Sequence, residues 1–275
     1  MLDAVLLFRE SLYGTLVIAL ACAVIGVYVV LRRIVFVGAA LAQISSAGIA
    51  IALWLAGLGV AHGLTGHPLA VSLLITLGGV AFFATPDRGD IPPDAGIGVA
   101  YAVAAAAGIL FIAKAKSGEA HDIFLQGNIL GITRHDTLLL LSASLPVLVA
   151  HAVFYKEFLF VSFDRETART LGYRVRRWDL ALYLTLGVVI AFAMQFAGVM
   201  LVFNFLVLPA VTGLLVSRSM RGTFVVSIAS ALLAALVGFA GSIPFDLPTG
   251  PAIIAVSGFL VAVAWSVKHL QRGSA

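Results

Sequence analysis

The sequence predicts an all-α, polytopic membrane protein with eight or nine transmembrane helices. Hydrophobic residues make up 61% of the 275 residues, charged residues only 11%, and the mean hydropathy is +1.10. A soluble domain averages about 25% charged residues, so the polar residues are too few to cover a water-soluble globule of this size. The one cysteine, Cys22, lies in an apolar run and excludes a disulfide-rich fold.

Nine apolar segments follow one another, and each approaches the roughly 20 residues that a helix needs to cross a bilayer. They cover residues 12–31, 35–58, 68–84, 95–113, 137–154, 178–196, 198–216, 223–242 and 252–267. Only residues 114–136 and 155–177 form connections longer than a simple turn requires. We therefore expect residues 1–275 to form a single transmembrane domain.

The positions of the 17 Lys and Arg residues predict an orientation. If the C-terminus is cytoplasmic, only Arg9, Lys114, Lys116 and Arg134 lie outside, and all other basic residues lie inside. This asymmetry fits the positive-inside rule, so we expect an external N-terminus and a cytoplasmic C-terminus. The net charge of +4 then reflects anchoring at the membrane, and no nucleic-acid partner is expected.

No sequence motif supplies an energy source. The pattern G-x-x-x-x-G-K-[ST] for nucleotide binding is absent, as are H-E-x-x-H and G-x-S-x-G. No acidic or basic residue lies deep in a predicted helix, which weakens the case for an ion-coupled carrier. The chain is therefore expected to be a pore, or the membrane part of a machine that another subunit drives.

The inner connection, residues 155–177, contains a short helix with both ends marked. Asp164 suits an N-cap, Glu166 falls in the first turn, and Gly172 suits the left-handed position after the last turn. These signals predict a helix over residues 165–171, outside the membrane, with Ala168 on a small face. It is either an amphipathic connector or a docking helix for a motor subunit.

The spacing Glu166-x-Ala168-x-x-x-Gly172 resembles the E-A-A-x-x-x-G loop of ATP-binding-cassette (ABC) importer permeases. Four further segments are similar, in order, to permeases of ABC importers for zinc, manganese and iron. They are residues 31–38, 126–130, 197–210 and 246–250, and Asp179 follows the loop as in that family.

This resemblance implies a membrane subunit in the bacterial cytoplasmic membrane that couples to a separate ATPase through Asp164, Glu166, Ala168 and Gly172. It also implies an extracytoplasmic metal-binding protein and a second permease copy as partners, besides the surrounding lipid. The partner ATPase binds ATP and magnesium, and the permease itself holds no cofactor. It is no enzyme, and the expected activity is alternating access that carries zinc, manganese or iron.

One segment departs from the family. The second helix there commonly begins G-D-x-L-S-H-x-x-L-P-G, whereas residues 38–48 place Ala39 at the acidic position and Gln43 at the histidine position. Alanine cannot bind a metal, and glutamine offers only a neutral oxygen. Either the metal passes without that pair, or the chain carries a different small solute.

Polar residues in two predicted helices are candidates for the translocation path: Gln43, Ser45, Ser46, Asn204 and Pro209. Small polar residues also join helices in membrane bundles, so packing is the alternative for the serines. Pro209 frees a backbone carbonyl that Asn204 could satisfy instead of lining a path.

The outer connection carries weak candidates for a metal site, His121, Asp122 and His135. Their spacing matches no strong metal signature, and ordinary loop polarity explains them equally well. The leading hypothesis is thus a permease subunit of an ATP-driven metal importer. A stand-alone channel or secondary carrier, and a membrane scaffold that transports nothing, are the alternatives.

Overall fold

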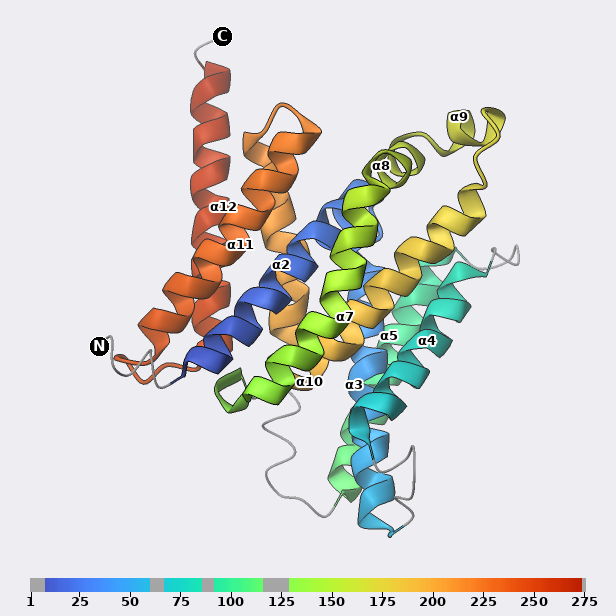
Figure 1. The fold of residues 1–275 in the computed structure, drawn as a ribbon, viewed down its shortest axis with the longest axis vertical. Helices are drawn as coiled ribbons and strands as arrows, with labels where there is room; N and C mark the ends of the chain where they lie inside the picture. The colour runs from blue at the N-terminus through green and yellow to red at the C-terminus, as the bar shows by residue number, and fades with distance from the viewer. Residues whose placement is uncertain (1–7, 60–66, 86–91, 116–128, 274–275) are drawn as a thin grey trace.

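The computed structural model describes residues 8–59, 67–85, 92–115 and 129–273, and every element in these ranges is helical (Figure 1). The membrane-length helices are α2 (Arg9–Leu31), α3 (Val35–Gly57), α4 (Pro68–Ala84), α5 (Pro93–Lys114), α7 (Arg134–Val153), α10 (Val175–Val216), α11 (Met220–Ser242) and α12 (Thr249–Gly273). Shorter elements are η2 (Ile129–Gly131), α8 (Tyr155–Phe163) and α9 (Arg165–Thr170).

Helix α10 consists of two membrane-length arms. A straight helix of its 42 residues would measure about 63 Å, about twice the hydrocarbon thickness of a bilayer. Gly198 interrupts it with φ 69° and ψ 167°, and the chain turns back there (Figure 1). The turn falls at the predicted boundary between the sixth and seventh apolar segments, because Gly198 is the first residue of the seventh and this backbone conformation is open only to glycine.

Seven of the described helices are long and apolar enough to cross a membrane. Helix α4 is a shorter apolar helix of 17 residues, and α10 contributes two arms. The described part of the chain therefore holds nine apolar segments, in the order that the sequence predicts.

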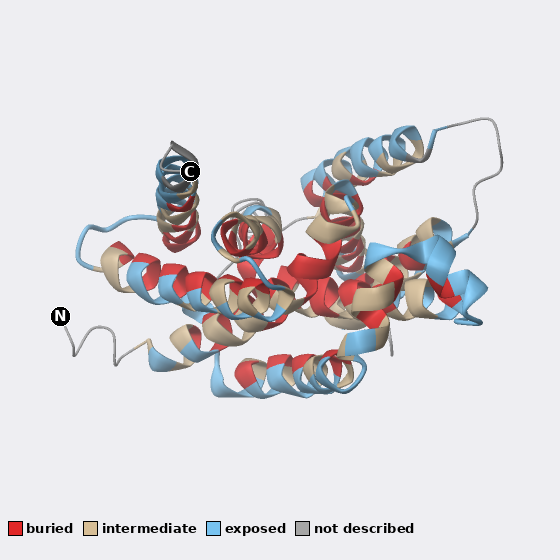
Figure 2. Ribbon diagram, turned by 90° about the horizontal axis from the view of Figure 1, so that it is seen from above, coloured by how far each residue is buried: buried red, intermediate tan, exposed pale blue. Residues whose placement is uncertain are grey.

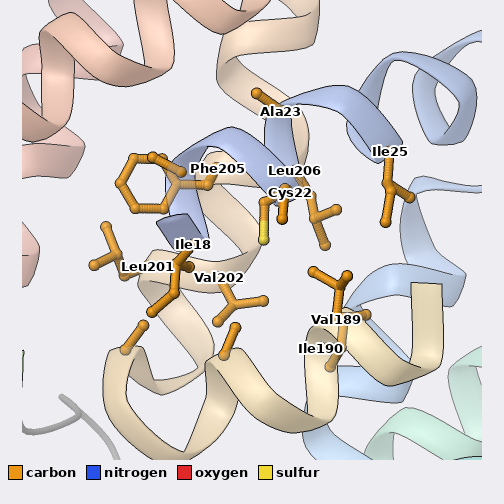
Figure 3. Packing of buried hydrophobic residues seen from close by; sticks show 14 of the residues in the cluster. Ile18, Cys22, Ala23, Ile25, Val189, Ile190, Leu201, Val202, Phe205 and Leu206 are labelled. Carbon is orange, nitrogen blue, oxygen red and sulfur yellow. The ribbon is translucent and has the colours of Figure 1, made fainter. Parts of the chain in front are cut away.

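The centre of the bundle is the contact between α2 and both arms of α10. Figure 3 shows Ile18, Cys22 and Ile25 of α2 facing residues from the two arms, Val189 and Ile190 on one and Leu201, Val202, Phe205 and Leu206 on the other. Gly26 allows the closest approach, because a Cβ there would lie 2.1 Å from the carbonyl oxygen of Leu206. Helices in lipid associate through such close packing, since lipid tails are as apolar as the helices.

Burial follows from this arrangement. Buried residues form a continuous band through the middle of the bundle, and exposed residues lie on the outward faces of the surrounding helices (Figure 2). Many exposed residues are large and apolar, as on α5 and α7, because these faces border lipid.

The two ends of the bundle differ in charge. Helices α8 and α9 and the C-terminal end of α12 lie at one end, which we call the basic end (Figure 1). The described basic residues on segments that reach it include Arg32, Arg33, Lys156, Arg165, Arg169, Arg174, Arg176, Arg177, Arg218, Arg221 and Lys268. Arg9, Lys114 and Arg134 belong to the opposite ends of α2, α5 and α7. The described basic residues therefore separate as the sequence predicts.

Candidate functional site

The connection between α7 and α10 folds into a pair of short helices at the basic end, α8 and α9 (Figure 1). Helix α9 begins as the sequence predicts. The Asp164 carboxylate accepts hydrogen bonds from the Thr167 backbone N–H at 2.9 Å and the Thr167 hydroxyl at 2.6 Å. These bonds, led by the one from the hydroxyl, hold the pKa of Asp164 below its usual range, so the cap carries its charge.

Gly172 follows α9 with φ +85°, the left-handed conformation that the sequence predicts. Tyr173 N–H donates to the carbonyl of Ala168 at 3.0 Å and closes the last turn. The helix ends at Thr170, one residue before the predicted end. Helix α8 was not predicted, because its apolar residues lack a cap signal of their own.

Ala168 faces inward, and its small side chain approaches the neighbouring helices closely. Its side chain is fully buried with Val161 of α8 and Val175 of α10. Ala168 therefore fixes α9 to its neighbours, because a larger side chain has no room there. The outward surface of α9 is formed instead by exposed residues, which include Glu166, Arg169 and Leu171.

A buried arginine joins this element to the rest of the bundle. Arg32, just after α2, forms an ion pair with Asp179 in the first turns of α10, and its Nε donates to the Ser162 hydroxyl of α8 at 2.8 Å. Arg165 at the start of α9 contacts the same oxygen of Asp179 at 3.1 Å. One carboxylate thus connects α2, α9 and α10, and Arg32 adds α8.

The environment of Arg32 makes this network costly to break. Its side chain is 2% exposed, whereas that of Arg165 is 50% exposed. Burial lowers the pKa of Arg32, and the charge of Asp179 opposes that effect. A buried charge that loses its partner is strongly destabilising, so Arg32 and Asp179 hold each other in place.

Arg32 and Asp179 lie in two separate segments that resemble the permease family, and the sequence does not show that they pair. The two residues are 147 positions apart, and no local pattern joins them. One signal for the pairing was present in the sequence. Each of two apolar segments has a charged residue at its edge, where an unpaired charge is unfavourable.

Ser45, a candidate path residue, forms a contact between α3 and α4 instead. Its hydroxyl lies 2.8 Å from that of Ser72, which also donates to the Ser45 carbonyl at 2.9 Å. A Cβ at Gly48 would lie 2.7 Å from the Ser72 Cα, so the backbones are in close contact. The structure thus favours the packing alternative for Ser45.

Gln43 and Ser46 remain the more informative polar residues of α3. Gln43 is half-buried, while the fully buried Ser46 hydroxyl has no hydrogen-bond partner within the described ranges. Ala39 lies one turn before Gln43 and is also buried. These three residues therefore provide no charged ligand, in agreement with the sequence analysis.

Asn204 lies in the second arm of α10, five residues before the buried Pro209. Its amide nitrogen donates to the Ser257 hydroxyl of α12 at 3.1 Å. Its amide oxygen is buried and has no partner in the part of the chain that the structure describes. Asn204 thus joins α10 to α12 and leaves one acceptor free.

Of the three candidate metal ligands at the outer end, the structure describes one. His121 and Asp122 lie outside the described residues, and His135 is exposed. Asp136 caps α7, accepting from the backbone and hydroxyl of Thr133 at 2.9 and 2.7 Å. Within the four described ranges, no three His, Cys, Asp or Glu side chains come together to hold an ion.

Comparison with known proteins places this helical bundle and its α8–α9 element in a transport family. The model of the ABC 3 transport family matches residues 5–268. The chain therefore belongs to the ABC 3 transport family. The resemblance that the sequence carries, to permeases of metal ABC importers, is thereby confirmed.

Relatives of known kind match along nearly their whole length. The manganese transport system membrane protein MntC of Listeria innocua is 28% identical over 94% of this chain and 89% of its own length. A probable iron transport system membrane protein of Haemophilus influenzae is 29% identical over 96% and 95%. The structure of PsaBC from Streptococcus pneumoniae in complex with Fab shares the fold, with a TM-score of 0.84 and 23% identity over 96% of this chain and 94% of that one.

Proposed function

We propose that this chain is the membrane-spanning permease subunit of an ATP-driven importer for a divalent transition metal. The observation that carries the proposal is the capped helix α9, which presents Glu166 outward at the basic end of an ABC 3 family bundle. Manganese and iron are the first candidates, because the names of the relatives include these metals. Zinc is the third candidate from the sequence resemblance.

A separate ATPase drives the transport cycle. When its two nucleotide-binding domains close, they push α9 through a contact with the exposed surface around Glu166. Asp179 and Arg32 pass this movement to α10 and α2, which form the centre of the bundle. The helices then open alternately to the two sides of the membrane.

The working assembly contains two permease copies, two ATPase copies and an extracytoplasmic metal-binding protein. ATP and magnesium bind to the ATPase, and the permease, a single domain over residues 1–275, carries out no chemistry. The basic end, with the C-terminus, faces the cytoplasm of a bacterial cell, because the positive-inside rule places basic connections there.

The path runs past polar residues of α3 and of the second arm of α10. Gln43, Ser46 and Asn204 offer neutral oxygens, two of them without a partner among the described residues. Pro209 interrupts the hydrogen bonding of its arm, and Ser45 supports the path indirectly through Ser72. Ala39 and Gln43 distinguish this path from the usual acidic and histidine pair, so weak binding and fast release are expected.

Co-purification with the ATPase tests the coupling. The permease alone should hydrolyse no ATP, and the variant Glu166→Arg, Gly172→Pro should fail to retain the ATPase, because proline cannot adopt φ +85°. Arg33→Gln, an exposed change at the same end, is the matched control. Normal retention by the first variant, with an unchanged elution volume, would disprove the docking role of α9.

The cargo is tested by cellular metal content. Cells with and without the chain are compared for manganese, iron, zinc and cobalt under metal limitation. A deficit in one or more of these metals on deletion supports the proposal. Unchanged content of all four, with the ATPase complex intact, would show that the importer carries a different solute.

A further inference from the structure

A cavity of about 380 Å³ lies against the first turns of α10, at the basic end. Arg174, Arg177, Trp178 and Ala181 line it. These positions are three, one and three residues apart, so they share one face of the helix. The lining belongs to the start of a helix that enters the membrane.

The two arginines at this cavity have no anionic partner among the residues that the structure describes. The ion pairs among the described residues involve Arg9, Arg32 and Arg165, and neither cavity arginine. The first turn of α10 contains no acidic residue. The nearest carboxylate along the helix, Asp179, is already shared by Arg32 and Arg165. Two exposed guanidinium groups thus face the cavity uncompensated.

The aromatic wall of the cavity places it at the level of the membrane surface. Trp178 packs against Phe154, with ring centroids 5.5 Å apart, and against Phe158 at 5.2 Å. Tryptophan is enriched at this depth in membrane proteins, because its ring is largely apolar and its N–H polar. Phe154 follows the last residue of α7, so the cavity adjoins the end of that helix.

Below the cavity, toward the membrane interior, α7 and α10 present apolar side chains. Val149 and Val153 of α7 are 52% and 67% exposed, and Leu180 and Leu184 of α10 are 41% and 40% exposed. Acyl chains can lie along this surface while a polar group occupies the cavity. The combination of cationic cavity and apolar surface matches the two parts of a phospholipid.

We propose that this cavity binds the phosphate headgroup of an anionic phospholipid, with Arg174 and Arg177 as its ligands. Guanidinium groups bind phosphate oxygens through paired, charge-assisted hydrogen bonds. Basic pockets between membrane helices on the cytoplasmic side are known to bind anionic headgroups. The bound lipid fixes the start of α10, and therefore the α8–α9 element next to it, at the membrane surface.

Native mass spectrometry of the full chain tests this site. The protein is released from nanodiscs of phosphatidylcholine that contain phosphatidylglycerol or cardiolipin, and the retained lipids are counted. The variant Arg174→Gln, Arg177→Gln should bind the anionic lipids about thirtyfold more weakly, given roughly 1 kcal/mol for each arginine near an anionic surface. Both residues are exposed, so the variant should keep its thermal stability.

The matched control is Arg218→Gln, Arg221→Gln, which removes the same charge from two exposed positions, one just before α11 and one in its first turn. It should retain the lipids as the unchanged protein does. Equal loss in both variants would reduce the effect to general charge attraction and overturn the site. Trp178→Leu supplies a second test, since it should weaken retention without changing net charge, and full retention would contradict the proposed cavity.

Two further measurements separate the sources of phosphate. Inorganic phosphate at millimolar concentration should not displace the lipid, because the apolar surface contributes to its binding, and full displacement would indicate a site for free phosphate. The ATPase should still co-purify with Arg174→Gln, Arg177→Gln. If the ATPase were lost while lipid retention stayed normal, the arginines would belong to the ATPase interface instead.

Discussion

The guanidinium of Arg32 and the carboxylate of Asp179 form a buried ion pair between the end of α2 and the start of α10. The same carboxylate contacts Arg165 at the start of α9. The helix proposed to meet the ATPase is thus joined through one acidic side chain to the two helices at the centre of the bundle. A movement of α9 cannot leave α2 and α10 unaffected while this pair is intact.

Removal of either member of the pair should destabilise the protein and reduce transport. Asp179→Asn leaves the buried Arg32 guanidinium without its carboxylate, at a cost of about 3–5 kcal/mol. Arg32→Ala should cost less, because Asp179 is partly exposed and keeps its contact with Arg165. Arg32→Lys should be intermediate, because it keeps the charge but loses the donor to Ser162. Thermal unfolding of the detergent-solubilised protein measures the first effect.

The role in transmission is measured in the complex with the ATPase. Arg165→Ala leaves Arg32 and Asp179 paired, and Arg165 is half exposed, so stability should change by less than about 1 kcal/mol. Uptake per ATP hydrolysed should nevertheless fall, because α9 is no longer tied to Asp179. Arg33→Gln should change neither quantity, and uptake per ATP that is normal in Arg165→Ala would argue against transmission through Asp179.

Gly26→Val should prevent normal packing of α2 on α10. Its Cβ would lie 2.1 Å from the carbonyl oxygen of Leu206, a backbone atom that cannot move aside alone. Overpacking of this kind costs about 1–3 kcal/mol or more, and the melting temperature should fall. Gly78→Ala is the control, since open space surrounds that position and alanine is the better helix former.

Gly198→Ala should strain the turn between the arms of α10. Alanine is strongly disfavoured at φ 69° and ψ 167°, at a cost of order 1–3 kcal/mol. We expect lower expression and a lower melting temperature. Gly241→Ala, in α11 and free of neighbours within 4 Å, should be tolerated. Equal stability of the two variants would show that the arms can join through another backbone conformation.

Gln43→Leu should separate a path residue from a packing residue. If Gln43 borders the path, metal uptake should fall severalfold while thermal stability is kept, because the residue is only half-buried. Ser45→Ala should instead lower thermal stability and leave metal uptake unchanged. It removes a hydrogen bond to Ser72 worth about 0.6 kcal/mol by comparison with other membrane proteins. Uptake that is unchanged in Gln43→Leu would exclude this residue from the path.

The fold was predictable from sequence to the extent that lipid imposes it. The lengths of the apolar runs predicted the nine segments, and the uneven distribution of Lys and Arg predicted which connections lie on the same side of the membrane. Both features can be read locally, because the bilayer selects them segment by segment. The caps of α9 were predictable for a similar reason, since Asp164 and Gly172 act on backbone groups within a few residues.

Contacts between distant segments were not predictable in this way. The apolar segments predicted a boundary between residues 196 and 198, but the reversal of the chain depends on the positive φ of Gly198, which the apolar pattern does not specify. The sequence predicts a small face at Ala168, but only the structure shows that this face packs on α8 and α10, because α8 has no cap signal of its own in the sequence.

The sequence by itself determined that this chain lies in lipid, crosses it repeatedly and carries a capped helix between two of its spans. Only the tertiary structure decided that Arg32 meets Asp179, that Ser45 meets Ser72, and that two arginines and a tryptophan line an open cavity. The physical reason is the distance along the chain over which each interaction acts. Membrane insertion and helix capping act between a residue and its immediate surroundings, whereas pairing across 147 positions depends on how all the intervening helices pack.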